Sequence, residues 1–119
     1  MNIEEFSAYC LAKKSVEACF PFDEVTLVFK VAGKLFALTG LDEEEFKVNL
    51  KCSPERAVQL RETYPEAIVP GYHMSKKHWN TVNFEAGLDE KLLTELIDHS
   101  YELVVAALPK KVKVEFGFN

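Results

Sequence analysis

The chain has 119 residues, a formal net charge of −5 and 48% hydrophobic residues. This length suits one domain with a single core, and the composition is too apolar for a disordered chain. The acidic balance argues against a protein that holds nucleic acid by its overall charge, because such binding neutralises phosphates with lysine and arginine. No apolar run is long enough to cross a bilayer and the N-terminal residues lack a signal-peptide pattern, so we expect a cytoplasmic protein with no membrane partner.

The N-terminal half of the sequence predicts one helix and three strands. Asn2 and Glu5 have the spacing of a capping box, which predicts a helix over residues 3–14. Gly33 separates two runs rich in β-branched and aromatic residues, as the tight turn of an antiparallel hairpin would. Apolar and polar residues then alternate along a further half-buried strand. The three predicted strands are 26–31, 34–38 and 46–51.

The C-terminal half predicts two more helices. Ser53 and Pro54 are typical of a helix start, and this helix ends before Pro65. Asp89 is placed to cap the longest helix, whose apolar stripe stops at Pro109. Between these two helices lie two runs that predict strands, at residues 68–69 and 78–84.

The tail of the chain alternates strictly between polar and apolar residues. Its apolar positions, which a strand would place on one side, are Val112, Val114, Phe116 and Phe118. This pattern predicts an extra edge strand over residues 110–119. Such a strand pairs either with its own sheet or with a second copy of the chain, and the second arrangement would make a homodimer.

Taken in order, the predicted elements describe an α+β fold. We expect a mostly antiparallel sheet with the N-terminal and the long C-terminal helices packed on one face. The regular βαβ alternation of a parallel sheet is missing, and no repeat or interdomain linker interrupts the sequence. Residues 1–119 are therefore predicted to form a single domain.

Cysteines and histidines do not form a pattern typical of a metal site. Cys10, Cys19 and Cys52 are odd in number and lack C-x-x-C spacing, so reduced thiols are expected. His73 and His78 are five residues apart, a spacing that places them on one face of neither a strand nor a helix. No nucleophile motif or phosphate-binding glycine pattern is present. We therefore expect no metal, no cofactor and no enzymatic activity.

The segment 70–82 contains the single tryptophan, two of the three histidines and a Lys-Lys pair. If it is extended beyond residue 76, Lys77, Trp79 and Thr81 share one face. An ammonium group, an indole and a hydroxyl together suit a phosphate backbone and an unstacked base. The alternative is that Trp79 is buried for packing and that Lys76 and Lys77 belong to an ordinary solvated turn.

Several segments of the sequence resemble one known family. They include Val48-Asn-Leu-Lys-Cys52, Pro70-Gly-Tyr-His-Met74, Lys77-His-Trp-Asn-Thr-Val82 and Leu96-Ile-Asp-His-Ser-Tyr101. With these segments the chain resembles the MmcQ/YjbR family of small bacterial proteins over nearly its whole length. The resemblance implies a frataxin-like (CyaY-like) α+β fold. It also implies the role proposed for that family, a double-wing DNA-binding protein in which two β-hairpin wings contact the duplex.

Two functions follow from these patterns. The first is a non-enzymatic DNA-binding protein, in which four lysines contact phosphates and three further residues shape the surface. The lysines are Lys34, Lys51, Lys76 and Lys77, and the shaping residues are His73, Trp79 and Asn80. The alternative is a module that binds a protein or a small ligand in a polar-aromatic pocket. That pocket would be lined by Tyr72, His73, His78, Trp79 and Asn80.

Overall fold

Six strands and four helices make up the part of the chain that the computed structural model describes, which is residues 1–72 and 74–118. In chain order they are α1 (Ile3–Leu11), β1 (Val16–Cys19), β2 (Thr26–Val31), β3 (Lys34–Gly40), β4 (Lys47–Lys51), α2 (Pro54–Thr63), β5 (Ile68–Pro70), β6 (Trp79–Asn83), α3 (Glu90–Ala106) and α4 (Lys110–Glu115). The strands form one sheet in the order β1-β2-β3-β4-β6-β5, and each neighbouring pair is antiparallel.

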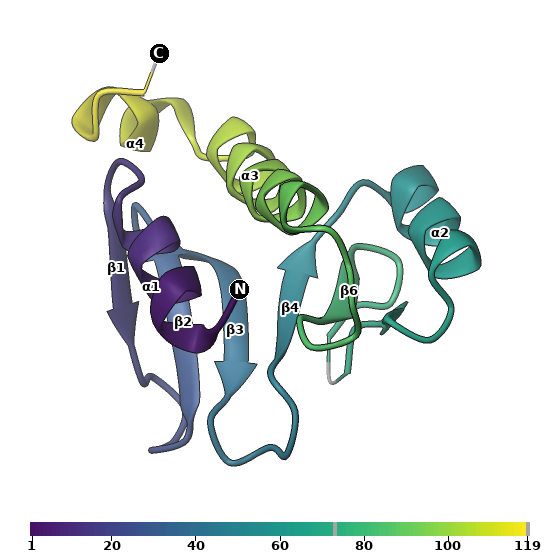
Figure 1. The fold of residues 1–119 in the computed structure, drawn as a ribbon. Helices are drawn as coiled ribbons and strands as arrows, with labels where there is room; N and C mark the ends of the chain where they lie inside the picture. Colours follow the sequence, from purple (N-terminus) through teal and green to yellow (C-terminus); the bar gives the residue numbers. More distant parts are fainter. Residues whose placement is uncertain (73, 119) are drawn as a thin grey trace.

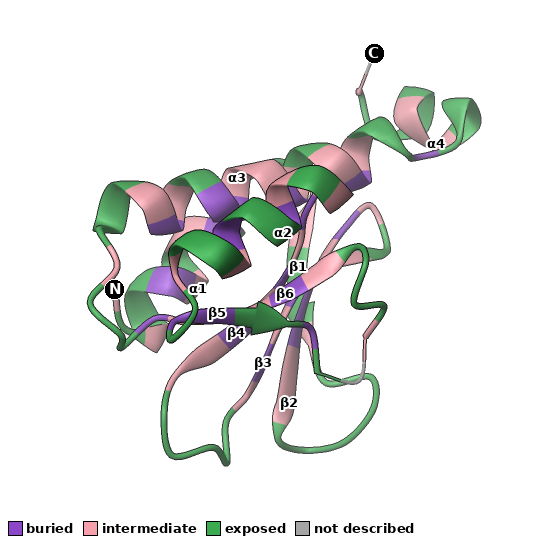
Figure 2. Cartoon of the chain, turned by 90° about the vertical axis from the view of Figure 1, so that its right-hand side faces the viewer, coloured by how far each residue is buried: buried purple, intermediate pink, exposed green. Residues whose placement is uncertain are grey.

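Helices α1, α2 and α3 lie in one layer on the same face of the sheet (Figures 1 and 2). Helix α3 contacts β2, β3 and β4, whereas α2 packs beside β5 and α1 beside β1. No helix of the described chain covers the opposite face, which we call the open face. This arrangement confirms the predicted α+β fold, with an antiparallel sheet and helices on one face.

The hydrophobic core lies between the helices and the sheet. Phe6 of α1 is fully buried and meets the rings of Phe29, Phe46 and Phe84 edge to face, at centroid distances of 5.3, 5.5 and 5.5 Å. The capping box forms as predicted: the Asn2 side chain accepts from the Glu5 N–H, and the Glu5 carboxylate accepts from the Asn2 N–H. The cap fixes the start of α1, and the phenylalanine cluster then holds the helix on the sheet.

Burial alternates along the two central strands β4 and β6, as a sheet with one covered face requires. The residues that face the helices are Val48, Leu50, Asn80 and Val82. Their neighbours on the open face include Lys51, Trp79 and Thr81. The register between β4 and β6 therefore decides which polar and aromatic side chains reach solvent.

The strand predicted over residues 110–119 is wrong, because residues 110–115 fold as helix α4; Asn119 lies outside the described residues. Backbone bonds of helical spacing, such as Lys113 N–H to the Pro109 carbonyl, hold it, and Gly117 ends it at a φ of 77°. Lys14 Nζ then donates to the Gly117 carbonyl at 2.7 Å, while the Phe118 ring meets Tyr101 edge to face. Up to Phe118, the tail therefore contains no strand of the kind predicted to pair with a second copy.

Smaller differences concern element boundaries. Helix α1 ends at Leu11, three residues before the predicted end, and β1 was not predicted at all. The remaining predicted strands and helices occur within a few residues of their expected positions. Within the described part of the chain, no helix combines the length and the apolar character needed to span a membrane.

Candidate nucleic-acid interface

Acidic residues gather at one end of the sheet. Successive connections of an antiparallel sheet alternate between its two ends. The register pairs Thr26–Gly40 and Lys47–Asn83 lie at one of these two ends. The four connections at this end contain nine Asp and Glu residues and neither Lys nor Arg. These connections are 20–25, 41–46, 64–67 and 84–89. We call this region the acidic end.

The opposite end carries lysines instead. Its four connections are 12–15, 32–33, 52–53 and 71–78. Their sequences contain Lys13, Lys14, Lys76 and Lys77 and no Asp or Glu. Lys34 at the start of β3 and Lys51 at the end of β4 lie at the same end of the sheet. We call this region the basic end.

Two hairpin tips project at the basic end. The β2–β3 hairpin turns at residues 32–33, where Gly33 has a φ of 82°, and the β5–β6 hairpin turns through residues 71–78. Strand β4 lies between the two hairpins. The middles of the hairpins are three strand spacings apart, which at about 4.8 Å each is roughly 14 Å. The sheet order therefore sets two loops side by side at one end with Lys51 between them.

Lys51 and Trp79 are direct register partners on the open face. Both side chains are half-buried, so the indole is neither in the core nor fully in solvent. Lys34, Lys76 and Lys77 are exposed at the same end of the sheet, Lys34 as the register partner of Val31 at the β2–β3 turn. We call these five residues the basic-aromatic patch. The ion pairs of the described chain are Lys13–Asp98 and Lys47–Glu45. Among the described residues, therefore, no lysine of the patch forms an ion pair with a carboxylate.

Gly71 allows the β5–β6 hairpin to approach Trp79 closely. Its N–H donates to the Trp79 carbonyl at 2.8 Å, and a Cβ at this position would lie 2.8 Å from the Trp79 Cβ. We expect Gly71→Ala to lower the free energy of unfolding by about 1–3 kcal/mol and to shift Trp79 emission, because strand β6 must move. Urea unfolding followed by tryptophan fluorescence measures both effects.

Gly40→Ala is the matched control for this change. A Cβ at Gly40 would make ordinary contacts of 3.4 Å with the Asp42 and Glu43 side chains. Its stability should stay within roughly 0.5 kcal/mol of wild type. Equal stabilities of the two variants would contradict a close approach at Gly71.

Asn80 does not lie on the surface where it was expected. It is 2% exposed and faces the helices. Its Oδ1 accepts from Arg61 Nε at 2.7 Å, and its Nδ2 donates to the Ala57 carbonyl at 3.3 Å. The Arg61 guanidinium also donates to the Lys76 carbonyl. Asn80 and Arg61 therefore join α2 to connection 71–78, a role that the sequence did not suggest for Arg61.

The alternative pocket is not assembled by the described residues. Trp79 and Asn80 are consecutive in β6 and face opposite sides of the sheet, so they cannot line one cavity. Tyr72 is exposed at the edge of the open face, and His78 is exposed in the loop before β6. His73, which belonged to both predicted sets, lies outside the described residues.

His99 has a structural place in the fold. Its Nε2 accepts a hydrogen bond from the Ser53 N–H at 3.2 Å, at the start of α2. Desolvation and the nearby Arg56 guanidinium lower the pKa of His99, against an opposing effect of Glu102. The neutral imidazole that accepts this bond is thus the favoured form. His99 ties α3 to α2 rather than presenting a free ligand.

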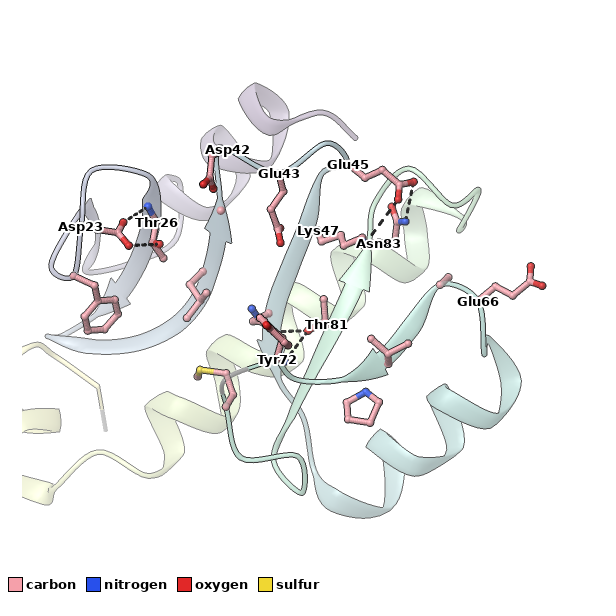
Figure 3. Close-up of a pocket in the computed structure, with 18 residues that line it drawn as sticks. Asp23, Thr26, Asp42, Glu43, Glu45, Lys47, Glu66, Tyr72, Thr81 and Asn83 are labelled. Atoms are coloured by element: carbon pink, nitrogen blue, oxygen red, sulfur yellow. Dashed lines mark hydrogen bonds and ion pairs between the residues drawn. The ribbon is translucent and has the colours of Figure 1, made fainter.

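A groove runs over the open face from the acidic end to Tyr72 and Met74 of connection 71–78 (Figure 3). Its volume is about 960 Å³, and it crosses residues of β2, β3, β4, β6 and β5. We call it the sheet groove. Five acids line it: Asp23, Asp42, Glu43, Glu45 and Glu66. The single lysine in its lining, Lys47, lies 3.9 Å from Glu45. Lys51 and Trp79 of the basic-aromatic patch thus share the open face with the sheet groove, whose charged lining is mainly acidic.

Several known proteins resemble this chain in sequence. YbdF from Escherichia coli O157:H7, named as uncharacterized, is 42% identical over 96 residues, which cover 81% of this chain and 78% of that protein. The uncharacterized YjbR from Escherichia coli K12 is 35% identical over 111 residues, or 93% of each chain. The uncharacterized YyaQ from Bacillus subtilis is 38% identical over 77 residues, or 65% of this chain and 63% of that protein.

Solved structures resemble the fold as well. The Deinococcus radiodurans protein DR2400, described as a DUF419 domain, superposes with a TM-score of 0.93 at 36% identity, over 99% of this chain and 89% of that one. A protein from Pseudomonas syringae gives a TM-score of 0.71 at 28% identity, over 87% and 98% of the two chains. The family model described as YjbR matches residues 11–103. The chain therefore belongs to the YjbR family.

Proposed function

We propose that this protein binds DNA through its basic end, without enzymatic activity. The observation that carries the proposal is the placement of both hairpin tips at the one end whose connections lack acids. Lys51 lies between the tips, and its register partner Trp79 begins β6 of the second hairpin on the open face. Two loops that project side by side are what the double-wing mode suggested for this family requires.

The dimensions of the basic end suit a duplex. The roughly 14 Å between hairpin middles is close to the major-groove width of about 12 Å, so the two tips can reach the phosphates on both sides of one groove. Lys34 on one hairpin and Lys76 and Lys77 on the other would contact those phosphates. The half-buried Trp79 ring offers a face for stacking a base where strands open.

The overall negative charge does not oppose this mode of binding. Strand β4 has five residues, which at about 3.3 Å each separate the basic and acidic ends by about 16 Å. The Debye length at physiological ionic strength is about 8 Å. DNA held at the basic end is therefore screened from the nine acids of the acidic end. A DNA partner also agrees with the cytoplasmic location expected from the sequence.

Fluorescence anisotropy of a labelled 20-bp duplex tests the proposal across a series of salt concentrations. Binding should weaken with a log–log slope of about −0.9 per phosphate contacted. We expect Lys76→Ala/Lys77→Ala to make this slope shallower by roughly 1.8 and to weaken unrelated duplex sequences alike, since phosphate contacts carry no sequence information.

Lys47→Ala/Lys91→Ala is the matched control, because it removes two lysines that lie away from the basic end. Its slope should match that of wild type. An equal loss in the control would point to non-specific charge and refute the assigned surface. Absence of binding by the wild-type chain at low salt would refute DNA binding itself.

A further inference from the structure

The open face carries a second surface that DNA binding does not use, namely the sheet groove. Its volume of about 960 Å³ is within the range of ligand sites in proteins. Among the described helices, α1, α2 and α3 all lie on the other side of the sheet. We infer that the sheet groove binds an extended, Lys/Arg-rich segment of a partner protein.

Charge complementarity selects this occupant. Five carboxylates line the groove, and its one lysine is already close to Glu45. The Asp42 and Glu43 side chains are turned over the sheet, because both lie 3.4 Å from the position of a Cβ on Gly40. Phosphate-bearing partners are repelled by such a surface, whereas a basic peptide is attracted.

The carboxylates are spread along the groove rather than gathered at one point. Within residues 1–72 and 74–118, no three His, Cys, Asp or Glu side chains are close enough together to hold one metal ion. A single small cation would therefore meet too few ligands. A chain that carries several separated positive charges fits this spacing better.

Exposed rings at the groove suit lysine and arginine side chains. Phe22 and Tyr72 line the groove and are 69% and 70% exposed, and Val69 between them in the sequence is 44% exposed. The aliphatic stems of Lys and Arg pack on such surfaces, and their charged heads interact with aromatic faces. Arginine should be preferred, because its planar guanidinium stacks on rings.

The length of the segment follows from the sheet. Groove residues come from five neighbouring strands, β2 to β5 in sheet order, which span four spacings of about 4.8 Å, or roughly 19 Å. An extended peptide advances about 3.3 Å per residue, so roughly six residues cross the groove. A hexapeptide is thus the shortest probe that uses its whole width.

Fluorescently labelled hexaarginine, hexalysine and hexaglutamate test this inference by anisotropy with the full chain. We expect hexaarginine to bind more tightly than hexalysine, and hexaglutamate not to bind. Asp42→Asn/Glu43→Gln should weaken hexaarginine roughly three- to thirtyfold, since exposed charge pairs contribute modestly each. Tyr72→Ala should weaken hexaarginine more than hexalysine.

Two controls separate the groove from general acidity. Glu24→Gln/Glu44→Gln removes two acids of the acidic end that do not line the groove, and Phe20→Ala removes an exposed ring outside the lining. Both should bind hexaarginine like wild type. Equal losses in these variants would overturn the inference. Lys76→Ala/Lys77→Ala should leave hexaarginine binding intact, because neither lysine lines the groove. DNA binding and peptide binding can therefore be tested separately.

Two further outcomes would reassign the occupant. Spermine that competes as strongly as hexaarginine, with the same sensitivity to Asp42→Asn/Glu43→Gln, would overturn a polypeptide partner in favour of a small polyamine. Sedimentation of wild type as a dimer that Asp42→Asn/Glu43→Gln dissociates would overturn it in favour of a second copy. If both wild type and Asp42→Asn/Glu43→Gln sediment as monomers, the result supports a separate partner protein.

Discussion

We expect Phe6→Ala to lower the free energy of unfolding by about 3–5 kcal/mol, because it leaves a cavity in the hydrophobic core. Phe6 is fully buried, and three phenylalanine rings surround it at centroid distances of 5.3–5.5 Å. Alanine is a good helix former, so the loss comes from packing and not from α1 itself. Urea unfolding should show a lower midpoint with an unchanged slope.

Leu11→Ala is the control for Phe6→Ala. Leu11 is in the same helix but is 48% exposed, so its change should stay within roughly 0.5 kcal/mol of zero. If Phe6→Ala fails to fold, Phe6→Leu still reports on the cavity with a smaller loss. A loss no greater than that of Leu11→Ala would contradict the phenylalanine cluster as the anchor of α1.

Replacing Ser100 with alanine has the second largest expected effect. Ser100 is fully buried in α3, and its Oγ donates to the Phe36 carbonyl at 2.5 Å while accepting from the Lys51 N–H at 2.9 Å. Alanine leaves both backbone groups without this partner inside the protein. Since each unpaired buried group costs about 1–3 kcal/mol, we expect a loss of about 2–4 kcal/mol.

Amide hydrogen exchange makes the Ser100→Ala test specific. The Lys51 N–H should exchange faster than in wild type, beyond any change shared by the whole sheet. Thr94→Ala is the control, because the Thr94 hydroxyl is on the same helix and donates only to the nearby Lys91 carbonyl. Comparable effects of the two changes would contradict a tie between α3 and strands β3 and β4.

Local patterns predicted most of the fold because they act over a few residues. The Asn2–Glu5 capping box and the Ser53-Pro54 start both mark real helices. The sequence did not predict strand β1, because Val16–Cys19 has little β pattern of its own and is held by pairing with β2. In the tail, six helical residues are too few to separate a period of 2 from one of 3.6.

The site was harder to predict, because it depends on which connections share an end. Trp79 and Thr81 share one face of β6, as expected from the sequence, and Val82 lies on the other face. That alternation also turns Asn80 inward, where Arg61 meets it across 19 residues of sequence. The separation of acidic from basic connections becomes visible only once the order of the strands is known.

The two edge strands of the sheet are short, which bears on how destabilised variants aggregate. Strand β5 has three residues and ends at Pro70, which has no amide hydrogen, and β1 on the far border has four. Short borders of this kind offer few backbone groups as a template for cross-β growth. A destabilised variant should therefore aggregate from its unfolded population, while its folded molecules remain in solution.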